Sequence, residues 1–156
     1  MAIASRLGPW LIGTVRETIG SSTTLGQVRN MGVTDVVQNK TIAFGDAAAS
    51  VACVIPAGSL IRAVQLLPTT AFTSGTTSTI QIFVNSSAIS AATTTSTGTT
   101  TLISIPIGTS NPALVANVGT SDVSITYTQA LATAGAGVLI VSYMVRNPDG
   151  TYGVNA

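Results

Sequence analysis

A series of short segments in which apolar and polar side chains alternate constrains the fold of this chain more than any other feature. In SDVSITYTQ (residues 121–129), the apolar residues Val123, Ile125 and Tyr127 alternate with serine and threonine. A period of two places the apolar side chains on one face of a β-strand. No long stretch combines apolar positions at helical spacing with charged residues on the opposite face. The sequence therefore predicts an all-β fold.

Further segments have the composition of strands and end near turn residues. They span residues 35–44, 50–58, 59–67, 78–86, 100–108, 112–119 and 136–147, and we expect Pro68 to end the third of them. About eight strands with turns at this spacing are typical of an antiparallel β-sandwich, and we predict one of the jelly-roll type. The Thr-rich segment Ala91–Thr101 is compatible with a loop or with an extended edge segment.

The last predicted strand differs from the others because it is apolar on both faces. In AGVLIVSYMVRN (residues 136–147), Leu139, Val141 and Tyr143 occupy one face, and Val138 and Ile140 occupy the other. A strand with two apolar faces lies in the centre of a sheet or is covered by a partner. We expect one of these two situations for residues 136–147.

The beginning of the chain differs in composition from the remainder. Residues 1–34 are rich in glycine and, together with Asp35, hold five of the eleven charged residues. Regularly spaced glycines disfavour a helix. We therefore predict an extended N-terminal arm over residues 1–34, with one or two short strands. Residues 35–156 are predicted to form the jelly-roll-like sandwich and a short C-terminal tail, which follows a reverse turn at NPDG (residues 147–150).

The residues that usually carry chemistry do not form a catalytic or metal-binding pattern. The chain has no histidine, its five carboxylates are scattered, and Cys53 is its only cysteine. Histidine is the commonest general base and metal ligand, and a zinc thiolate site needs several cysteines. We therefore expect no enzymatic activity, no metal and no cofactor. Cys53 is predicted to be a core residue because its neighbours are apolar, and Asp122 a turn residue before a strand.

Charge and hydropathy weigh against two classes of partner. The net charge is only +1, without the basic surface that proteins use to bind nucleic acids. The chain also lacks an apolar run of about 18 residues, so we expect no membrane-spanning helix. Because only 7% of the residues are charged, the composition favours a structural subunit of an assembly. The second alternative is a carbohydrate-binding sandwich, although a sugar site normally presents several aromatic side chains.

The segment SRLGPWLIGTV (Ser5–Val15) holds the single tryptophan of the chain, Trp10, close to Arg6. Tryptophan and arginine are the residue types most enriched where protein interfaces gain their binding energy. Trp10 therefore either anchors a partner protein or folds back onto the sandwich of its own chain. The sequence leaves both alternatives open.

The N-terminal segment resembles the start of small structural proteins of tailed bacteriophages. The resemblance rests on an Arg-X-Gly-Pro-Trp-Leu-X-Gly-Thr-Val opening, a Gly/Thr-rich segment and an Arg-Asn-X-Gly element, which here are Arg6, Gly8 to Leu11, Gly13 to Val15, Arg29, Asn30 and Gly32. Proteins of this type often decorate, or cement, the capsid as jelly-roll homotrimers. The resemblance thus implies a virion protein on the outer surface of the capsid, assembled in the host cytoplasm. Phage neck, tail and head-fibre proteins are the alternatives within this class.

A mechanical hypothesis for such a virion role names the residues that contact the capsid. The expected partners are the major capsid protein and further copies of this chain, with no nucleic acid and no membrane. In this hypothesis Trp10, Leu11 and Ile12 fill an apolar groove on an adjacent capsid subunit. Arg6, Arg16 and Arg29 meet carboxylates or backbone carbonyls there.

Overall fold

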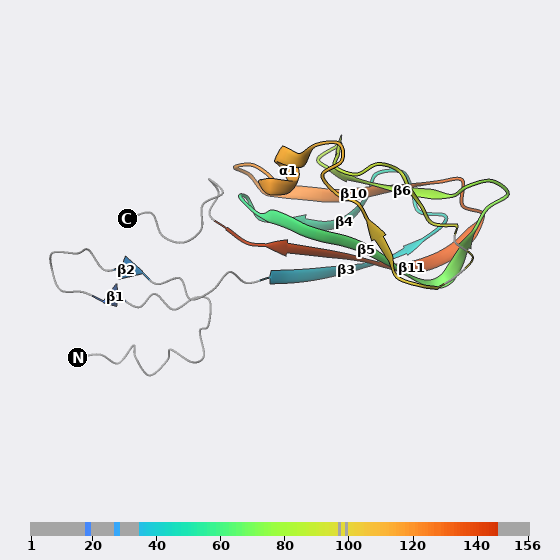
Figure 1. Cartoon of the computed structure of the whole chain (residues 1–156), viewed down its shortest axis with the longest axis horizontal. Helices are drawn as coiled ribbons and strands as arrows, with labels where there is room; N and C mark the ends of the chain where they lie inside the picture. The colour runs from blue at the N-terminus through green and yellow to red at the C-terminus, as the bar shows by residue number, and fades with distance from the viewer. Residues whose placement is uncertain (1–17, 20–26, 29–34, 97, 99, 147–156) are drawn as a thin grey trace.

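The computed structural model describes residues 18–19, 27–28, 35–96, 98 and 100–146, and these form two antiparallel β-sheets packed face to face (Figure 1). A short separate pair of strands, β1 (Thr18–Ile19) and β2 (Gln27–Val28), precedes the sandwich in the sequence. The all-β sandwich predicted from the alternating segments is therefore confirmed.

The first sheet consists of four strands around the long strand β11. Its spatial order is β3 (Asp35–Ala43), β11 (Ala134–Met144), β5 (Leu60–Thr73) and β9 (Ile103–Ile105). Strand β11 pairs with β3 along one side and with β5 along the other, so it is central in this sheet. This agrees with the first of the two situations expected for residues 136–147.

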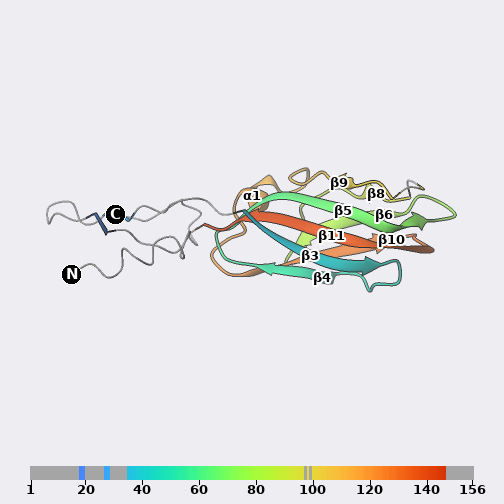
Figure 2. The same ribbon diagram turned by 90° about the horizontal axis from the view of Figure 1, so that it is seen from below.

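The second sheet is arranged in the same way around β10. Its spatial order is β4 (Ser50–Ile55), β10 (Val123–Ala130), β6 (Thr79–Val84) and β7 (Ser87–Ala88), and β8 (Thr93–Thr94) also pairs with β6. Apart from the short strands β7 and β8, successive strands from β3 to β11 alternate between the two sheets, so that their connections cross from one layer to the other (Figure 2).

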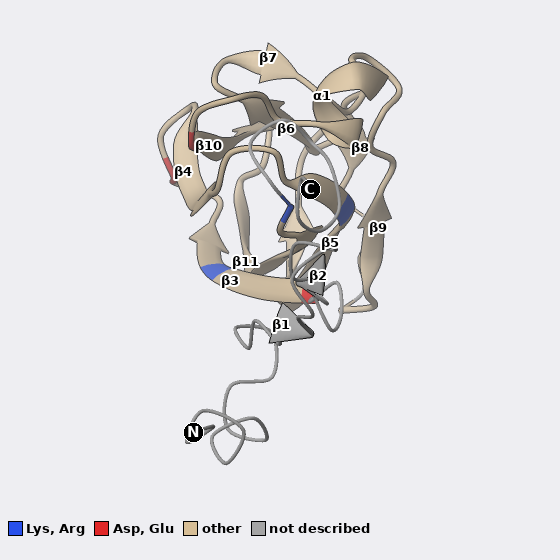
Figure 3. Cartoon of the chain, turned by 90° about the vertical axis from the view of Figure 1, so that its left-hand side faces the viewer, with Lys and Arg blue, Asp and Glu red and all other residues tan. Residues whose placement is uncertain are grey.

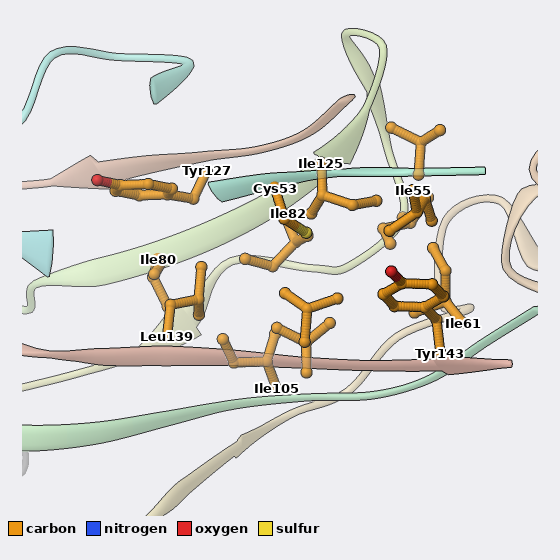
Figure 4. Close-up of a cluster of buried hydrophobic side chains, with 14 of the residues drawn as sticks. Cys53, Ile55, Ile61, Ile80, Ile82, Ile105, Ile125, Tyr127, Leu139 and Tyr143 are labelled. Carbon is orange, nitrogen blue, oxygen red and sulfur yellow. The ribbon is translucent and has the colours of Figure 1, made fainter. Parts of the chain in front are cut away.

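The core lies between the two inner sheet faces, as the alternation predicts. Ile125 and Tyr127 of β10 face Leu139 and Tyr143 of β11 across the sandwich, and all four side chains are buried (Figure 4). Cys53 of β4 belongs to the same cluster, which confirms its predicted core position. Because interior side chains of this kind each contribute about 1.5–3 kcal/mol by burial, the inner faces supply most of the driving force for folding.

Gln38 bridges the two sheets along the side where β3 and β4 are the neighbouring edge strands. Its side-chain amide donates to the Tyr143 hydroxyl at 2.6 Å and to the backbone carbonyl of Val54 at 3.2 Å. The first bond satisfies a phenol whose ring is buried, and the second ties β3 to β4. The edge of the core is therefore held by hydrogen bonds as well as by apolar contact.

The structure corrects two sequence predictions. Residues 112–119 do not form a strand, because Pro112–Ala116 is a short helix, α1. Proline at its start favours this helix, since the ring presets the backbone angle φ and the missing N–H would have no helical partner. Pro68 does not end a strand either, because β5 continues to Thr73. Pro68 lies opposite Gly137 at a shift of the strand register, where a strand tolerates proline.

The Thr-rich segment combines both of the structures considered for it. Among the residues of this segment that the structure describes, Thr93–Thr94 pair with β6 as an edge strand. Thr95 follows as a buried residue, and its hydroxyl lies 2.9 Å from the hydroxyl of Ser78. The Thr-rich sequence does not indicate this buried position, because threonine suits a strand surface and a loop equally well.

The two ends of the sandwich have different connections. We define the entry end as the end formed by Asp35, Gly58, Arg62, Ala116 and Arg146, where the described chain enters β3 and leaves β11. These two chain positions are close because Met144 pairs directly with Asp35. The far end holds the turn between β3 and β4 and the turn between β10 and β11.

Gly135 supplies a first test of the core packing. It has a φ of +132°, and an added Cβ would lie 2.4 Å from Cδ1 of the buried Phe72 ring. We expect Gly135→Ala to lower the free energy of unfolding by about 1–3 kcal/mol, because the positive φ strains an alanine and the added Cβ overlaps the Phe72 ring. Urea denaturation followed by circular dichroism measures this loss.

The matched control is Gly75→Ala, because an added Cβ at Gly75 meets no atom within 4 Å. Its free energy of unfolding should stay within about 0.5 kcal/mol of that of the parent chain. Equal effects of the two substitutions would contradict the close packing of Gly135 against Phe72.

Candidate functional site

The residues predicted to contact a partner lie outside the part of the chain that the structure describes. These residues are Arg6, Trp10, Leu11, Ile12, Arg16 and Arg29. Their segment is joined to the sandwich at Asp35, the first residue of β3. The entry end is therefore the described surface nearest in sequence to the predicted contact residues.

Arg146 organises the entry end. Its Nε donates to the carbonyl of Gly58 at 2.9 Å, and its Nη2 donates to the carbonyl of Ala116, the last residue of α1. Both bonds are charge-assisted, which makes them stronger than bonds between neutral groups. Arg146 thus fastens the end of β11 to the turn between β4 and β5 and to the helix.

A second pair of hydrogen bonds reinforces the same end. The N–H of Gly58 donates to the carbonyl of Gly119 at 2.7 Å, and the N–H of Val118 donates to the carbonyl of Ser59 at 3.1 Å. These bonds connect the segment after α1 to the turn that Arg146 also holds. Hydrogen bonds therefore join the connecting segments of the entry end to one another and to the end of β11.

The entry end also presents an exposed ion pair. Arg62 Nη1 lies 4.0 Å from Asp35 Oδ1, and both side chains are about half exposed. Exposed pairs of this kind contribute only about 0–1 kcal/mol to stability. Both charges are therefore accessible to a partner surface. Figure 3 looks onto this end and shows how few charged residues the sandwich carries.

The far end contains a buried phenol bound to a carboxylate. The Tyr127 hydroxyl donates to Asp46 Oδ2 at 2.5 Å, and the backbone N–H of Ala43 donates to the same oxygen at 2.9 Å. The bond from Tyr127, followed by that from Ala43, holds the pKa of Asp46 below its ordinary value. Burial and the neighbouring carboxylate raise the pKa of Tyr127. Asp46 therefore serves the fold by closing the β3–β4 turn over the core.

The other described side chains that could be catalytic, Asp122 and Cys53, also have structural roles. Asp122 accepts a hydrogen bond from the backbone N–H of Ala57 at 3.1 Å just before β10, as expected for a turn residue. Burial raises the pKa of the Cys53 thiol to about 11, which disfavours the reactive thiolate. Within the described residues, no three His, Cys, Asp or Glu side chains are grouped as metal ligands.

The outer surfaces of the sandwich present aliphatic side chains that the sequence analysis did not single out as a site. Val37 and Leu67 are exposed on the first sheet, Val54 on the second, and Leu131 at the far end. The signal for the first of these surfaces was the strand that is apolar on both faces. The other exposed residues carry no comparable signal, because single apolar residues are common on protein surfaces.

Comparison with known proteins gives no assignment. No protein-family model, curated protein or solved structure matches this chain. Among the described residues there is also no helix with the length and hydropathy of a membrane span.

The bond between Tyr127 and Asp46 predicts a specific pH dependence. Because the pKa of Asp46 is lowered by folding, its contribution to stability is complete above about pH 4 and is lost as the pH falls through the folded-state value. Tyr127→Phe should therefore lower the free energy of unfolding by about 1–3 kcal/mol at neutral pH, and by much less in strong acid. Urea denaturation over this pH range measures the difference.

Tyr143→Phe is the matched control. Its hydroxyl is bonded to the neutral amide of Gln38, so the cost of removing it should not change in acid. A cost of Tyr127→Phe that is the same at neutral and acidic pH would contradict a charged partner.

Proposed function

We propose that the sandwich is a jelly roll. The strand orders of the two sheets support this proposal. An eight-stranded jelly roll, with its strands lettered B to I, has sheets in the order B-I-D-G and C-H-E-F. When β8 is set aside and the strands from β3 to β11 are lettered in sequence, the orders β3-β11-β5-β9 and β4-β10-β6-β7 correspond to these two sheets.

We further propose that the protein is a virion structural protein that decorates and stabilises the capsid of a tailed bacteriophage. In this proposal it bridges subunits of the major capsid protein on the outer surface of the capsid and acts as a homotrimer. Jelly rolls are common in viral capsid proteins, which is consistent with this role. The N-terminal resemblance supplies the phage class, and the contact residues are those of the hypothesis based on the tryptophan and the arginines of the N-terminal arm.

The observation that carries the proposal is that the described chain enters and leaves the sandwich at one end. Asp35 and Met144 are paired neighbours, so residues 1–34 and 147–156 are both joined to the entry end. Arg146 connects the end of β11 to the turn between β4 and β5 at this end, and Arg62 and Asp35 are exposed charged residues there. A capsid contact made by the flanking segments would therefore form beside one preorganised surface of the body.

The proposed mechanism is mechanical. Residues 1–34 cross onto a neighbouring capsid subunit, where Trp10, Leu11 and Ile12 fill an apolar groove and the arginines pair with acceptors. A trimer engages three such sites at once, so the second and third contacts form at a high effective concentration. Weak individual contacts then add up to a stable clamp between capsid subunits.

A carbohydrate-binding module is the competing proposal, because jelly rolls also occur in lectins. Sugars commonly stack on exposed aromatic rings. Among the aromatic side chains that the structure describes, Phe72, Tyr127 and Tyr143 are buried. Phe44 at the far end and the half-buried Phe83 of β6 would have to supply the platform. This burial favours the capsid proposal.

Trp10→Ala tests the proposed anchor. A hot-spot tryptophan should contribute on the order of 2 kcal/mol, so each site should bind about 30-fold more weakly after the substitution. The measurement is binding of the full-length chain to emptied heads of the phage that encodes it, by co-sedimentation over a range of concentrations. Electron microscopy of the labelled particles separates a capsid position from neck, tail and fibre positions.

The matched control is Leu131→Ala, which removes a side chain that is 65% exposed at the far end and should leave binding unchanged. Unchanged head binding by Trp10→Ala, together with a lower unfolding midpoint, would mean that Trp10 packs on its own sandwich. Failure of the parent chain to bind heads, with clear hits on a glycan array, would favour the carbohydrate-binding proposal.

A further inference from the structure

The two sheets of the sandwich have four edges, and three of them are protected against the addition of a further strand. Strand β9 has only three residues, β7 and β8 have two each, and the part of β5 beyond β9 contains Pro68. Strand β4 has a shift in its register with β10, and its Val54 carbonyl already accepts a bond from Gln38. Short strands, bulges, prolines and covered backbone groups are the usual means by which proteins block the edges of their sheets. The fourth edge, β3, differs from the other three.

Strand β3 is a long and regular edge strand. It pairs with β11 over all nine of its residues without a register shift, and it contains no proline. No other described strand pairs with its second side, and it forms the border of the first sheet (Figure 1). An edge of this kind is a template on which an extended chain can add a strand.

The hydrogen bonds next to β3 show which of its backbone groups are free. The N–H of Phe44, the residue after β3, donates to the Gly135 carbonyl at 3.1 Å, which continues the register of β3 with β11. In an antiparallel ladder every second residue bonds to the neighbouring strand, so the even-numbered residues of β3 bond to β11. The N–H and C=O groups of Val37, Asn39 and Thr41 therefore point to the open side. These three residues are exposed, and within the described part of the chain their backbone groups have no further hydrogen-bond partner.

The bonds of Ala43 agree with this assignment and mark where the free edge ends. The N–H of Ala43 donates to Asp46 Oδ2, and the carbonyl of Ala43 accepts from the Asp46 N–H. Both groups of this odd-numbered residue thus point away from β11, but the β3–β4 turn already uses them. The free groups therefore span residues 37–41, which is enough for a short added strand.

Lys40 determines the charge of this free edge. Its side chain is exposed, and it attracts Asp46 without forming an ion pair, since Arg62 and Asp35 make the only ion pair within 4.0 Å among the described residues. The backbone of Lys40 bonds to β11, so Lys40 would form a non-hydrogen-bonded pair with a residue of an added antiparallel strand. The two Cα atoms of such a pair are about 4.5 Å apart. Opposite charges stabilise a cross-strand pair, so an acidic residue fits opposite Lys40.

The same lysine disfavours a second copy of β3 as the added strand. Two copies would match their free backbone groups about a twofold axis at Asn39, which places Lys40 opposite Gln38 of the other copy. The two Lys40 side chains would then be diagonal neighbours on one face, about 7–8 Å apart, where like charges repel. A strand with an acidic residue avoids this repulsion and gains an attraction at the same position.

We infer that the open edge of β3 binds an extended strand of another protein. The added strand runs antiparallel to β3, because antiparallel pairing is the more stable arrangement, and it bonds to the free groups of residues 37–41. It carries an acidic residue opposite Lys40. Residues opposite Val37 and Thr41 are β-branched, since such side chains pack well against each other across neighbouring strands. This inference does not depend on the proposed capsid role.

A capped peptide tests this inference. Its central residues are valine, glutamate, threonine, threonine and valine, so the glutamate lies opposite Lys40 when the two valines lie opposite Thr41 and Val37. The measurement is amide hydrogen exchange of the full-length protein by NMR, with and without the peptide. Exchange at Val37, Asn39 and Thr41 should slow about tenfold when about nine-tenths of the protein is bound, because only the unbound fraction exchanges freely. The Lys40 amide, which already bonds to β11, should change little.

Asn39→Pro removes the central free N–H, and Asn39→Ala is its matched control because alanine keeps that N–H. We expect Asn39→Pro to bind the peptide at least about tenfold more weakly, and Asn39→Ala to bind it as the parent chain does. Proline is tolerated on an edge strand where its nitrogen faces away from the neighbouring strand. Far-ultraviolet circular dichroism checks that both variants fold.

A charge exchange supplies a second test that does not require proline in β3. Lys40→Glu should weaken binding of the glutamate peptide about two- to fivefold. It should strengthen binding of the same peptide with lysine in place of glutamate by a similar factor. This reversal of preference is expected only if the central residue of the peptide lies beside position 40.

Several results would overturn the inference. These are unchanged exchange at the three free amides in the presence of the peptide, equal binding by folded Asn39→Pro and the parent chain, and an unchanged preference after Lys40→Glu. Slow exchange at the three amides without peptide, lost on dilution, would also overturn it, because a second copy would then occupy the edge. None of these results concerns head binding by residues 1–34, so the proposed function would stand if this inference failed.

Discussion

The contact between the two inner sheet faces is the interaction on which the rest of this structure depends. Ile125 and Tyr127 of β10 and Leu139 of β11 are buried in it, and each comes from the central strand of its sheet. The edge strands and the helix attach to these two central strands directly or through their neighbours. Because the described part of the chain has few charged side chains, the free energy of folding comes chiefly from removing apolar surface from water.

The polar side chains with the longest-range hydrogen bonds act at the borders of this core, while the buried hydroxyls of Ser78 and Thr95 pair with each other. Each of the two buried tyrosines reaches the rim, where Tyr127 bonds to Asp46 and Tyr143 bonds to Gln38. Arg146 has a similar role at the entry end, where it connects a strand, a turn and the helix. Such bonds contribute because a buried polar atom without a partner is costly. They also determine where the chain closes over the ends of the sandwich, so they position the proposed contact surfaces.

The proposed function assigns a role to one end of the body. The entry end is joined to the flanking segments and presents an exposed ion pair, and it is proposed to stand next to the capsid. A protein that holds a particle together in this way gains from avidity, which arises when several linked copies bind at once.

The sequence by itself determined the all-β class, the inner faces of the strands and the core position of Cys53, because a period of two is a local property of the chain. It also indicated that β11 is apolar on its outer side, but it did not indicate which strands pair with β11. Only the tertiary structure decided that Pro68 lies within a strand and that PALVA is a helix, since the register shift at Pro68 and the hydrogen bonds around the helix depend on residues distant in the sequence. The partners of Asp46 and Arg146 were decided in the same way, because those bonds join residues far apart in the sequence. The six predicted contact residues lie outside the described part of the chain, so their role stays a prediction.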